Sequence, residues 1–207
     1  MRRIALLVVF ALQACTSFEY VPPVGTHPKV SVDSPKGFDE TWQAIIESFA
    51  ETNTSIKTIE KVSGLVTAER MVPVSEIGAG YVDFGSISRV DVAPNLQKPP
   101  MHWRSWTSSL IFNVFLKKVE GDKCSLSVHT GWRGIVQHSS YNAWNGQTMV
   151  TAVNVDGIST GKFETELLTS ILAKLGATNP NIVIVGGPVP REQKRGNFAS
   201  NAADDYP

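Results

Sequence analysis

Histidine, cysteine and serine are the side chains of this sequence that could carry catalysis or bind a metal. The four histidines, His27, His102, His129 and His138, include no pair at the three- or four-residue spacing that puts two ligands on one helical face. His129 and His138 could meet across a hairpin; the alternative is an exposed strand histidine and a loop histidine. No His-Glu-x-x-His, Gly-x-Ser-x-Gly or phosphate-binding glycine loop occurs. We therefore expect no enzyme, no metal site and no cofactor.

The two cysteines, Cys15 and Cys124, have different sequence surroundings. Cys124 alternates in phase with Leu126 and Val128, which predicts that its thiol points into the core as a small apolar group. The alternative is a reactive thiol. Because Cys15 belongs to the N-terminal pattern described below, we expect no intrachain disulfide.

Aromatic residues, two of them beside arginines, gather outside the regular parts of the sequence. Tryptophan and tyrosine bury a large area at low entropic cost and are frequent in binding hot spots. Arginine beside tryptophan can add stacking or carboxylate contacts. We therefore expect residues 94–106 and 132–146 to form a surface for a protein partner. Its residues are Trp103, Arg104, Trp106, Trp132, Arg133, Tyr141 and Trp144. The alternative is that these aromatic side chains cover the open face of a sheet.

The N-terminal segment has the composition of an export signal. Two arginines precede an apolar run from Ile4 to Ala14, which is about half the roughly 20 residues that a transmembrane helix needs. Leu12-Gln13-Ala14-Cys15 resembles the lipobox of bacterial lipoproteins. The resemblance implies that residues 1–14 are a signal peptide and that Cys15 becomes the N-terminus, carrying acyl chains such as palmitate. The alternative is an ordinary signal peptide followed by an incidental cysteine.

The same resemblance implies a location for the protein. Thr16 follows the cysteine instead of the aspartate that is associated with retention in the inner membrane. We therefore expect a protein anchored in the outer membrane and facing the periplasm. Two or more acyl chains would hold it there stably.

Composition indicates one globular domain with no affinity for nucleic acid. The 207 residues are 42% hydrophobic and 18% charged, within the normal range for a folded domain. Lysine plus arginine and aspartate plus glutamate both number 19. A nucleic-acid-binding protein needs a clustered basic surface, and this balance does not predict one.

Proline and glycine positions predict the domain boundaries. Residues 15–29 contain three prolines and few apolar residues, which predicts a flexible tether. Residues 30–186 should form a single domain, and residues 187–207 a disordered tail.

Apolar periodicity predicts two amphipathic helices and several strands. Helices are expected from Phe38 to about Thr52 and from a Thr160 cap to Gly176. Expected strands cover 30–32, a short segment containing Ile56 and Ile59, 65–70, 107–118 and 124–132, with an edge strand at 182–185. Residues 131–155 show no clear period, which predicts a loop with at most a short strand.

This element order predicts an α+β fold, in which an antiparallel sheet packs two amphipathic helices on one face. Three segments of the sequence resemble BamC-like helix-grip lipoprotein domains. They are Ser34–Trp42, Lys61–Thr67 and Ser159–Glu164. The resemblance implies a helix-grip-like sheet.

The expected function is that of a lipid-anchored binding or scaffolding subunit of an outer-membrane or secretion-type assembly. Its partners would be membrane lipid, through acylated Cys15, and envelope proteins; a small-molecule ligand is not expected. The alternatives are an envelope hydrolase and a periplasmic carrier of lipids or other small molecules. Converging titratable groups would favour the hydrolase, and a large apolar pocket would favour the carrier.

Overall fold

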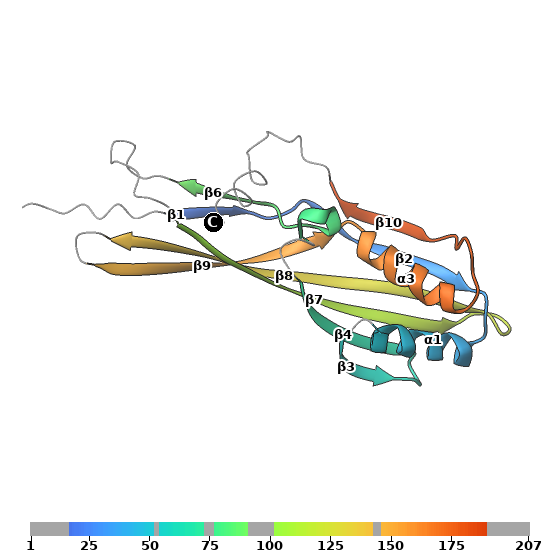
Figure 1. Cartoon of the computed structure of the whole chain (residues 1–207). Coiled ribbons are helices and arrows are strands. Elements are labelled where there is room, and N and C mark those ends of the chain that lie inside the picture. The colour runs from blue at the N-terminus through green and yellow to red at the C-terminus, as the bar shows by residue number, and fades with distance from the viewer. Residues whose placement is uncertain (1–16, 52–53, 73–76, 91–101, 143–145, 190–207) are drawn as a thin grey trace, which may run out of the picture.

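The computed structural model describes residues 17–51, 54–72, 77–90, 102–142 and 146–189. Two helices lie at one end of an elongated molecule, and long strands run from beneath them to the other end (Figure 1). The described residues form an eight-stranded antiparallel sheet and a separate two-stranded sheet. The predicted α+β class is confirmed.

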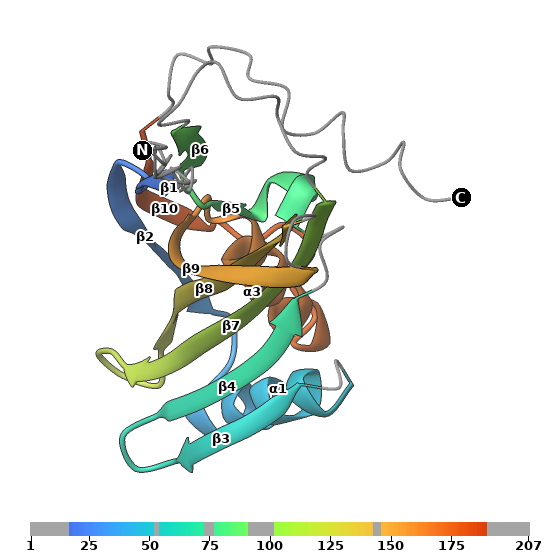
Figure 2. The same cartoon turned by 90° about the vertical axis from the view of Figure 1, so that its left-hand side faces the viewer.

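The main sheet has the strand order β10-β2-β8-β7-β4-β3, with β9 beside β8 and β5 beside β9. Viewed from the strand-only end, successive strands rotate relative to one another, as the usual sheet twist requires (Figure 2). The strands are β2 (Gly25–Ser34), β3 (Ser55–Glu60), β4 (Leu65–Val72), β5 (Val82–Asp83), β7 (His102–Lys118), β8 (Cys124–Asn142), β9 (Gln147–Ser159) and β10 (Val183–Pro188). In the smaller sheet, β1 (Ser17–Val21) pairs with β6 (Ser86–Val90).

The β7–β8 hairpin spans both halves of the molecule. Its pairing begins at Lys118 and Cys124 and continues to His102 and Ser139. In the inner half, β8 is flanked by β2 and β7 is flanked by β4. In the outer half, β8 is flanked by β9 instead. We call the outer three-stranded part the ribbon and define it as residues 102–107 of β7, 133–142 of β8 and 147–156 of β9.

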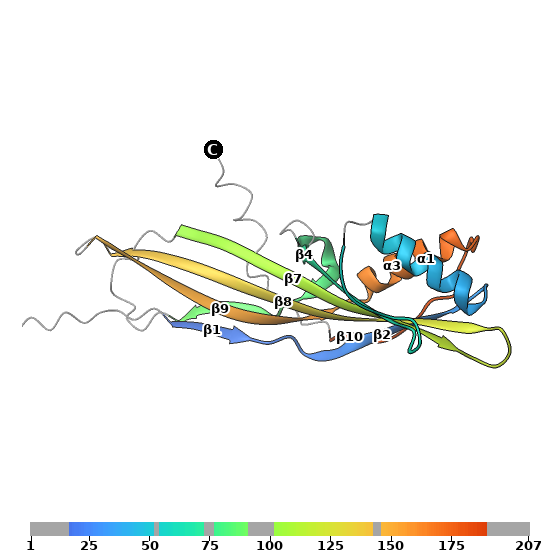
Figure 3. The same cartoon turned by 90° about the horizontal axis from the view of Figure 1, so that it is seen from below.

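Both helices lie on the same face of the inner half of the sheet (Figure 3). They are α1 (Phe38–Glu51) and α3 (Lys162–Lys174). Phe112 of β7 is the centre of their packing, because its ring meets Phe49 of α1 at 5.3 Å and Phe163 of α3 at 5.1 Å, both edge-on. The two amphipathic helices that the apolar periodicity predicted therefore both pack on one face of the sheet.

A buried carboxylate joins the start of α3 to the sheet. Glu164 has no exposed surface; it accepts hydrogen bonds from the Thr130 hydroxyl of β8 and from the Ser159 hydroxyl, at 2.7 Å, at the end of β9. The Ser159 oxygen in turn accepts the Gly161 amide at 3.1 Å. The predicted Thr160 cap is wrong, since the N-cap is Gly161 in the left-handed region and the Thr160 hydroxyl donates to the Gly80 carbonyl instead. Glu164 thus joins three elements.

The expected tether and tail are partly strands. β1 and the first half of β2 fall inside residues 15–29, so most of the predicted tether from Ser17 onward is strand. The Tyr20 hydroxyl donates to the Asp156 carbonyl at 2.8 Å, which holds β1 against β9. β10 likewise extends through Pro188, and the Val189 amide donates to the Val24 carbonyl. Residues 190–207 lie outside the described residues.

The prediction of a loop at residues 131–155 is also wrong. These residues form the outer half of β8 and most of β9, paired from Trp132–Gly157 to Asn142–Gln147. Strands with one buried face alternate apolar and polar residues, whereas strands with two open faces need not. The ribbon extends beyond the helices, and so the sequence lacks the alternation from which strands are predicted.

Gly157 makes room for the packing of β5 against β9. A Cβ at Gly157 would lie 2.4 Å from Val82 Cγ2 and 2.9 Å from the Phe84 ring. We expect Gly157→Ala to lower the free energy of unfolding by about 1–3 kcal/mol, because this overpacking displaces two buried side chains. Urea denaturation measures the change. Gly131→Ala is the control, since its Cβ would approach only the Ile111 carbonyl at 3.9 Å; equal stability of the two variants would contradict the prediction.

Candidate functional site

The ribbon brings together residues that lie far apart in the sequence. Trp103 pairs with His138, Trp106 pairs with Val136, and a bulge interrupts the register between Trp103 and Ser105. Tyr141 pairs with Thr148 on β9. The backbone positions of Trp103, Arg104, Trp106 and Tyr141 therefore belong to one three-stranded structure. Two further predicted residues, Cys15 and Trp144, lie outside the described residues.

The side chains that the structure describes on the ribbon are largely exposed. Ile135 is 40% exposed and Val150 is 63% exposed. Arg133 is exposed at the inner end of the ribbon, where its backbone pairs with Ser109 on one side and Asp156 on the other. The sequence analysis did not identify Ile135 and Val150 as candidate residues of the exposed surface. The signal that marks this segment is that no Asp, Glu, Lys or Arg occurs from Gly134 to Val155.

Trp132 does not belong to this exposed surface. Its side chain is 1% exposed and packs in the core, with its ring edge-on to Phe163 of α3 at 6.2 Å. The prediction that Trp132 contacts a partner is therefore wrong. It lies one residue before the ribbon, at the point where α3 still covers the sheet, and the same helix that hides Trp132 leaves Arg133 on the open side.

The suggestion that His129 and His138 meet across a hairpin is also wrong. Both belong to β8, nine residues apart, and a strand of that length separates them by about 30 Å. His129 instead contacts the Phe115 ring, edge-on at 5.6 Å, and His138 pairs with Trp103. Within the described ranges, no group of three or more His, Cys, Asp or Glu residues is arranged to hold a metal ion.

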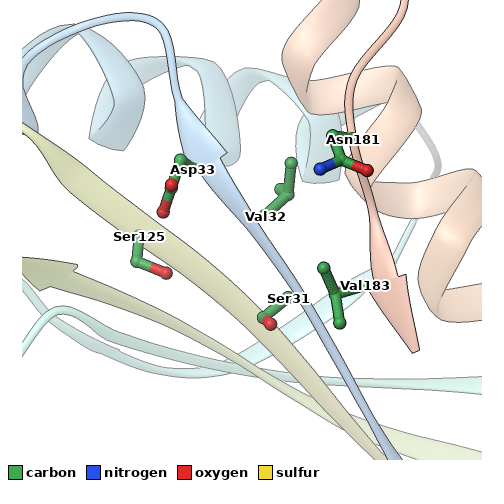
Figure 4. A pocket seen from close by; sticks show the side chains of 6 residues that line it. All are labelled: Ser31, Val32, Asp33, Ser125, Asn181 and Val183. Carbon is green, nitrogen blue, oxygen red and sulfur yellow. The ribbon is translucent and has the colours of Figure 1, made fainter. Parts of the chain in front are cut away.

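A shallow recess of about 180 Å³ lies where β2, β8 and the chain entering β10 meet (Figure 4). Ser31, Asp33, Ser125 and Asn181 supply its polar groups, and Asp33 and Ser125 are paired across β2 and β8. Binding pockets for small molecules usually enclose about 300–1,000 Å³. The recess can accept hydrogen bonds from a small polar group but is too shallow to enclose a larger ligand.

Cys124 lies in the core, as the strand alternation predicted. Its side chain is 1% exposed, and its Sγ is 3.5 Å from the Lys36 carbonyl, to which the thiol donates. Burial raises the pKa of the Cys124 thiol, because the apolar surroundings disfavour the thiolate. Its thiol is therefore held in the unreactive form at neutral pH.

Comparison of the sequence with known protein families found no match, and comparison with curated proteins found none either. In the parts of the chain that the structure describes, neither α1 nor α3 has the length and apolar character needed to cross a membrane.

Substitution of Trp132 distinguishes a core residue from a surface one. We expect Trp132→Ala to lower the free energy of unfolding by about 3–5 kcal/mol, because a large cavity would open between β8 and α3. Trp132→Phe should cost clearly less, since it keeps a ring against Phe163. Chemical denaturation followed by far-UV circular dichroism measures both. Wild-type stability of Trp132→Ala would contradict the core position.

Proposed function

We propose that this chain is a lipid-anchored protein of the bacterial cell envelope, held in the outer membrane on its periplasmic side. The sequence Leu12-Gln13-Ala14-Cys15, which resembles a lipobox, supports the anchor. Acylation of Cys15 would make membrane lipid its first partner. At least two acyl chains provide stable attachment, because each buried methylene contributes about 0.8 kcal/mol.

The domain behind this anchor acts as a binding or scaffolding subunit of an outer-membrane or secretion-type assembly. The observation that carries this proposal is the ribbon, a part of the sheet that extends past the helix-covered core and exposes apolar residues such as Ile135 and Val150. Exposed apolar surface on a folded domain commonly marks an interaction site. Arg133 adds a cation at the inner end of this surface, where it can bind a carboxylate of a protein partner.

We further propose that the inner half is helix-grip-like. Its support is the arrangement of α1 and α3 on one face of an antiparallel sheet (Figure 3). In this arrangement the helices serve stability, since their buried residues complete the core. The strands outside the helices remain available for recognition.

Replacement of Cys15 tests the anchor. We expect Cys15→Ser to abolish acylation, because the serine hydroxyl cannot form the thioether to diacylglycerol, and to release the protein from membranes. Metabolic labelling with a fatty-acid probe, followed by mass spectrometry of the N-terminal peptide, measures the modification. Cys124→Ala is the matched control and should keep the label. Cys15→Ser protein that is still processed and membrane-bound would contradict the anchor.

A photo-crosslinking amino acid at Ile135 tests the partner surface. We expect ultraviolet irradiation of intact cells to give a discrete protein adduct, because this position is exposed on the ribbon. The same amino acid at Glu47, exposed on α1, is the control and should give none. Mass spectrometry of the adduct identifies the partner. If position 135 gives only lipid adducts, the result would contradict the proposed scaffolding role.

A further inference from the structure

β10 forms one edge of the main sheet, and β2 is its inner neighbour (Figure 1). Alternate residues of an antiparallel strand direct their backbone N–H and C=O groups to opposite sides. Within the described ranges, the groups on the outer side of β10 have no strand to pair with. An edge strand of this kind is a template on which a further strand can pair.

The side chains along this edge are apolar and exposed on both faces of the sheet. Val183 and Ile184 are each 48% exposed, and Val185 is 62% exposed. Ile184 pairs with Val30, which has no exposed surface and lies in the core. Ile184 therefore lies on the helix-covered face of the sheet, and the two valines lie on its open face. A strand added to β10 would meet apolar groups on both faces.

The two edges of the main sheet differ in charge. β3, at the other edge, carries Lys57 and Glu60, and Lys57 forms an ion pair with Glu69 of β4 at 3.1 Å. Charged side chains on an edge strand, lysine above all, hinder pairing with another chain. By contrast, no Asp, Glu, Lys or Arg occurs from Leu175 to Pro190. The β10 edge therefore lacks the protection that the β3 edge has.

The pattern of these side chains is complementary to β10 itself. Two identical strands can pair antiparallel around a two-fold axis at Ile184. Val183 of each copy then lies opposite Val185 of the other on one face, and the two Ile184 side chains meet on the other face. Each exposed apolar side chain gains an apolar neighbour, and no charged group loses its water. A strand with charged residues would find no counter-charge on β10.

The second half of β10 limits how far this pairing can extend. The register with β2 shifts between Val185 and Gly187, and Pro188 has no N–H to donate. The ladder is therefore short, and it buries less than the roughly 1,200–2,000 Å² of a standard stable interface. We expect a dimer that dissociates on dilution. Because both copies use the same edge and the opposite edge is charged, the association closes at two copies.

We propose that β10 pairs with β10 of a second copy of this chain, which forms a two-fold dimer with one sheet continuing across both copies. This inference rests on neither the lipid anchor nor the ribbon, and its failure would leave both proposals intact. It adds a consequence to them, since one dimer presents two ribbons. A partner with two matching sites would then bind more tightly through avidity.

Cysteine crosslinking at the two-fold axis tests the dimer. The full chain, purified from membranes in detergent, is oxidised with copper phenanthroline. Strand pairing brings the two Cα atoms at position 184 within disulfide range, so we expect Ile184→Cys to form a linked dimer about tenfold faster than Ile59→Cys. Ile59 is the matched control, because it is 54% exposed on the opposite edge strand. The wild-type chain measures the background from Cys15, and Cys124 is buried.

Sedimentation velocity over a range of protein concentrations provides a second measurement. We expect the wild type to shift from monomer to dimer and Val185→Lys to stay monomeric, because the lysine places a hydrated charge in the new ladder. Ile59→Lys is the control and should dimerise as the wild type does. Far-UV circular dichroism shows that both variants are folded.

Three results would overturn the dimer. The first is Ile184→Cys that crosslinks no faster than Ile59→Cys, and the second is folded Val185→Lys that still dimerises. The third is a wild-type chain that stays monomeric at about 500 µM, where even a weak dimer would form. Hydrogen-exchange protection of the β10 amides in that monomer would assign the edge to another segment of this chain.

Discussion

The continuous pairing of β7 with β8 is the constraint on which the rest of this structure depends. The two strands contain 17 and 19 residues and keep one ladder from the turn beneath the helices to the outer end of the ribbon. Their inner halves complete the core with β2, β4 and the two helices, and their outer halves hold β9. The same two strands therefore belong to both the core and the ribbon. Because the core holds their inner halves in place, it also fixes the position of the exposed ribbon.

Glu164 lies where these two halves meet. Its carboxylate accepts hydroxyl groups from β8 and from the end of β9, at the point where the chain leaves the sheet and enters α3. A buried carboxylate is costly unless hydrogen bonds satisfy it. The arrangement therefore stabilises this junction only while Thr130 and Ser159 keep their positions.

The two ends of the long axis have different surfaces, and this difference underlies the proposed function. The helix end carries exposed ion pairs, such as Lys61 with Asp39 at 2.8 Å and Lys174 with Glu51 at 2.7 Å. Exposed pairs of this kind contribute little stability but keep a surface well solvated. The ribbon end has no charged residue from Gly134 to Val155 of its β8–β9 hairpin. The proposed contact of the ribbon with a protein partner fits this distribution.

The sequence by itself determined the elements that have one buried face. Apolar spacing predicted α1 and α3, and strand alternation predicted the inward position of Cys124, because in each case burial on one side imposes a period on the sequence. Only the tertiary structure showed that the ribbon consists of paired strands, that β1 pairs with β6 and that Trp132 is covered by α3. A buried face specifies the register in which a strand pairs. Where both faces of a strand are open to solvent, the local sequence does not specify its pairing partner. Trp132 and Arg133 are neighbours on one strand and so point to opposite faces, and the position of α3 determines that the face of Trp132 is the buried one.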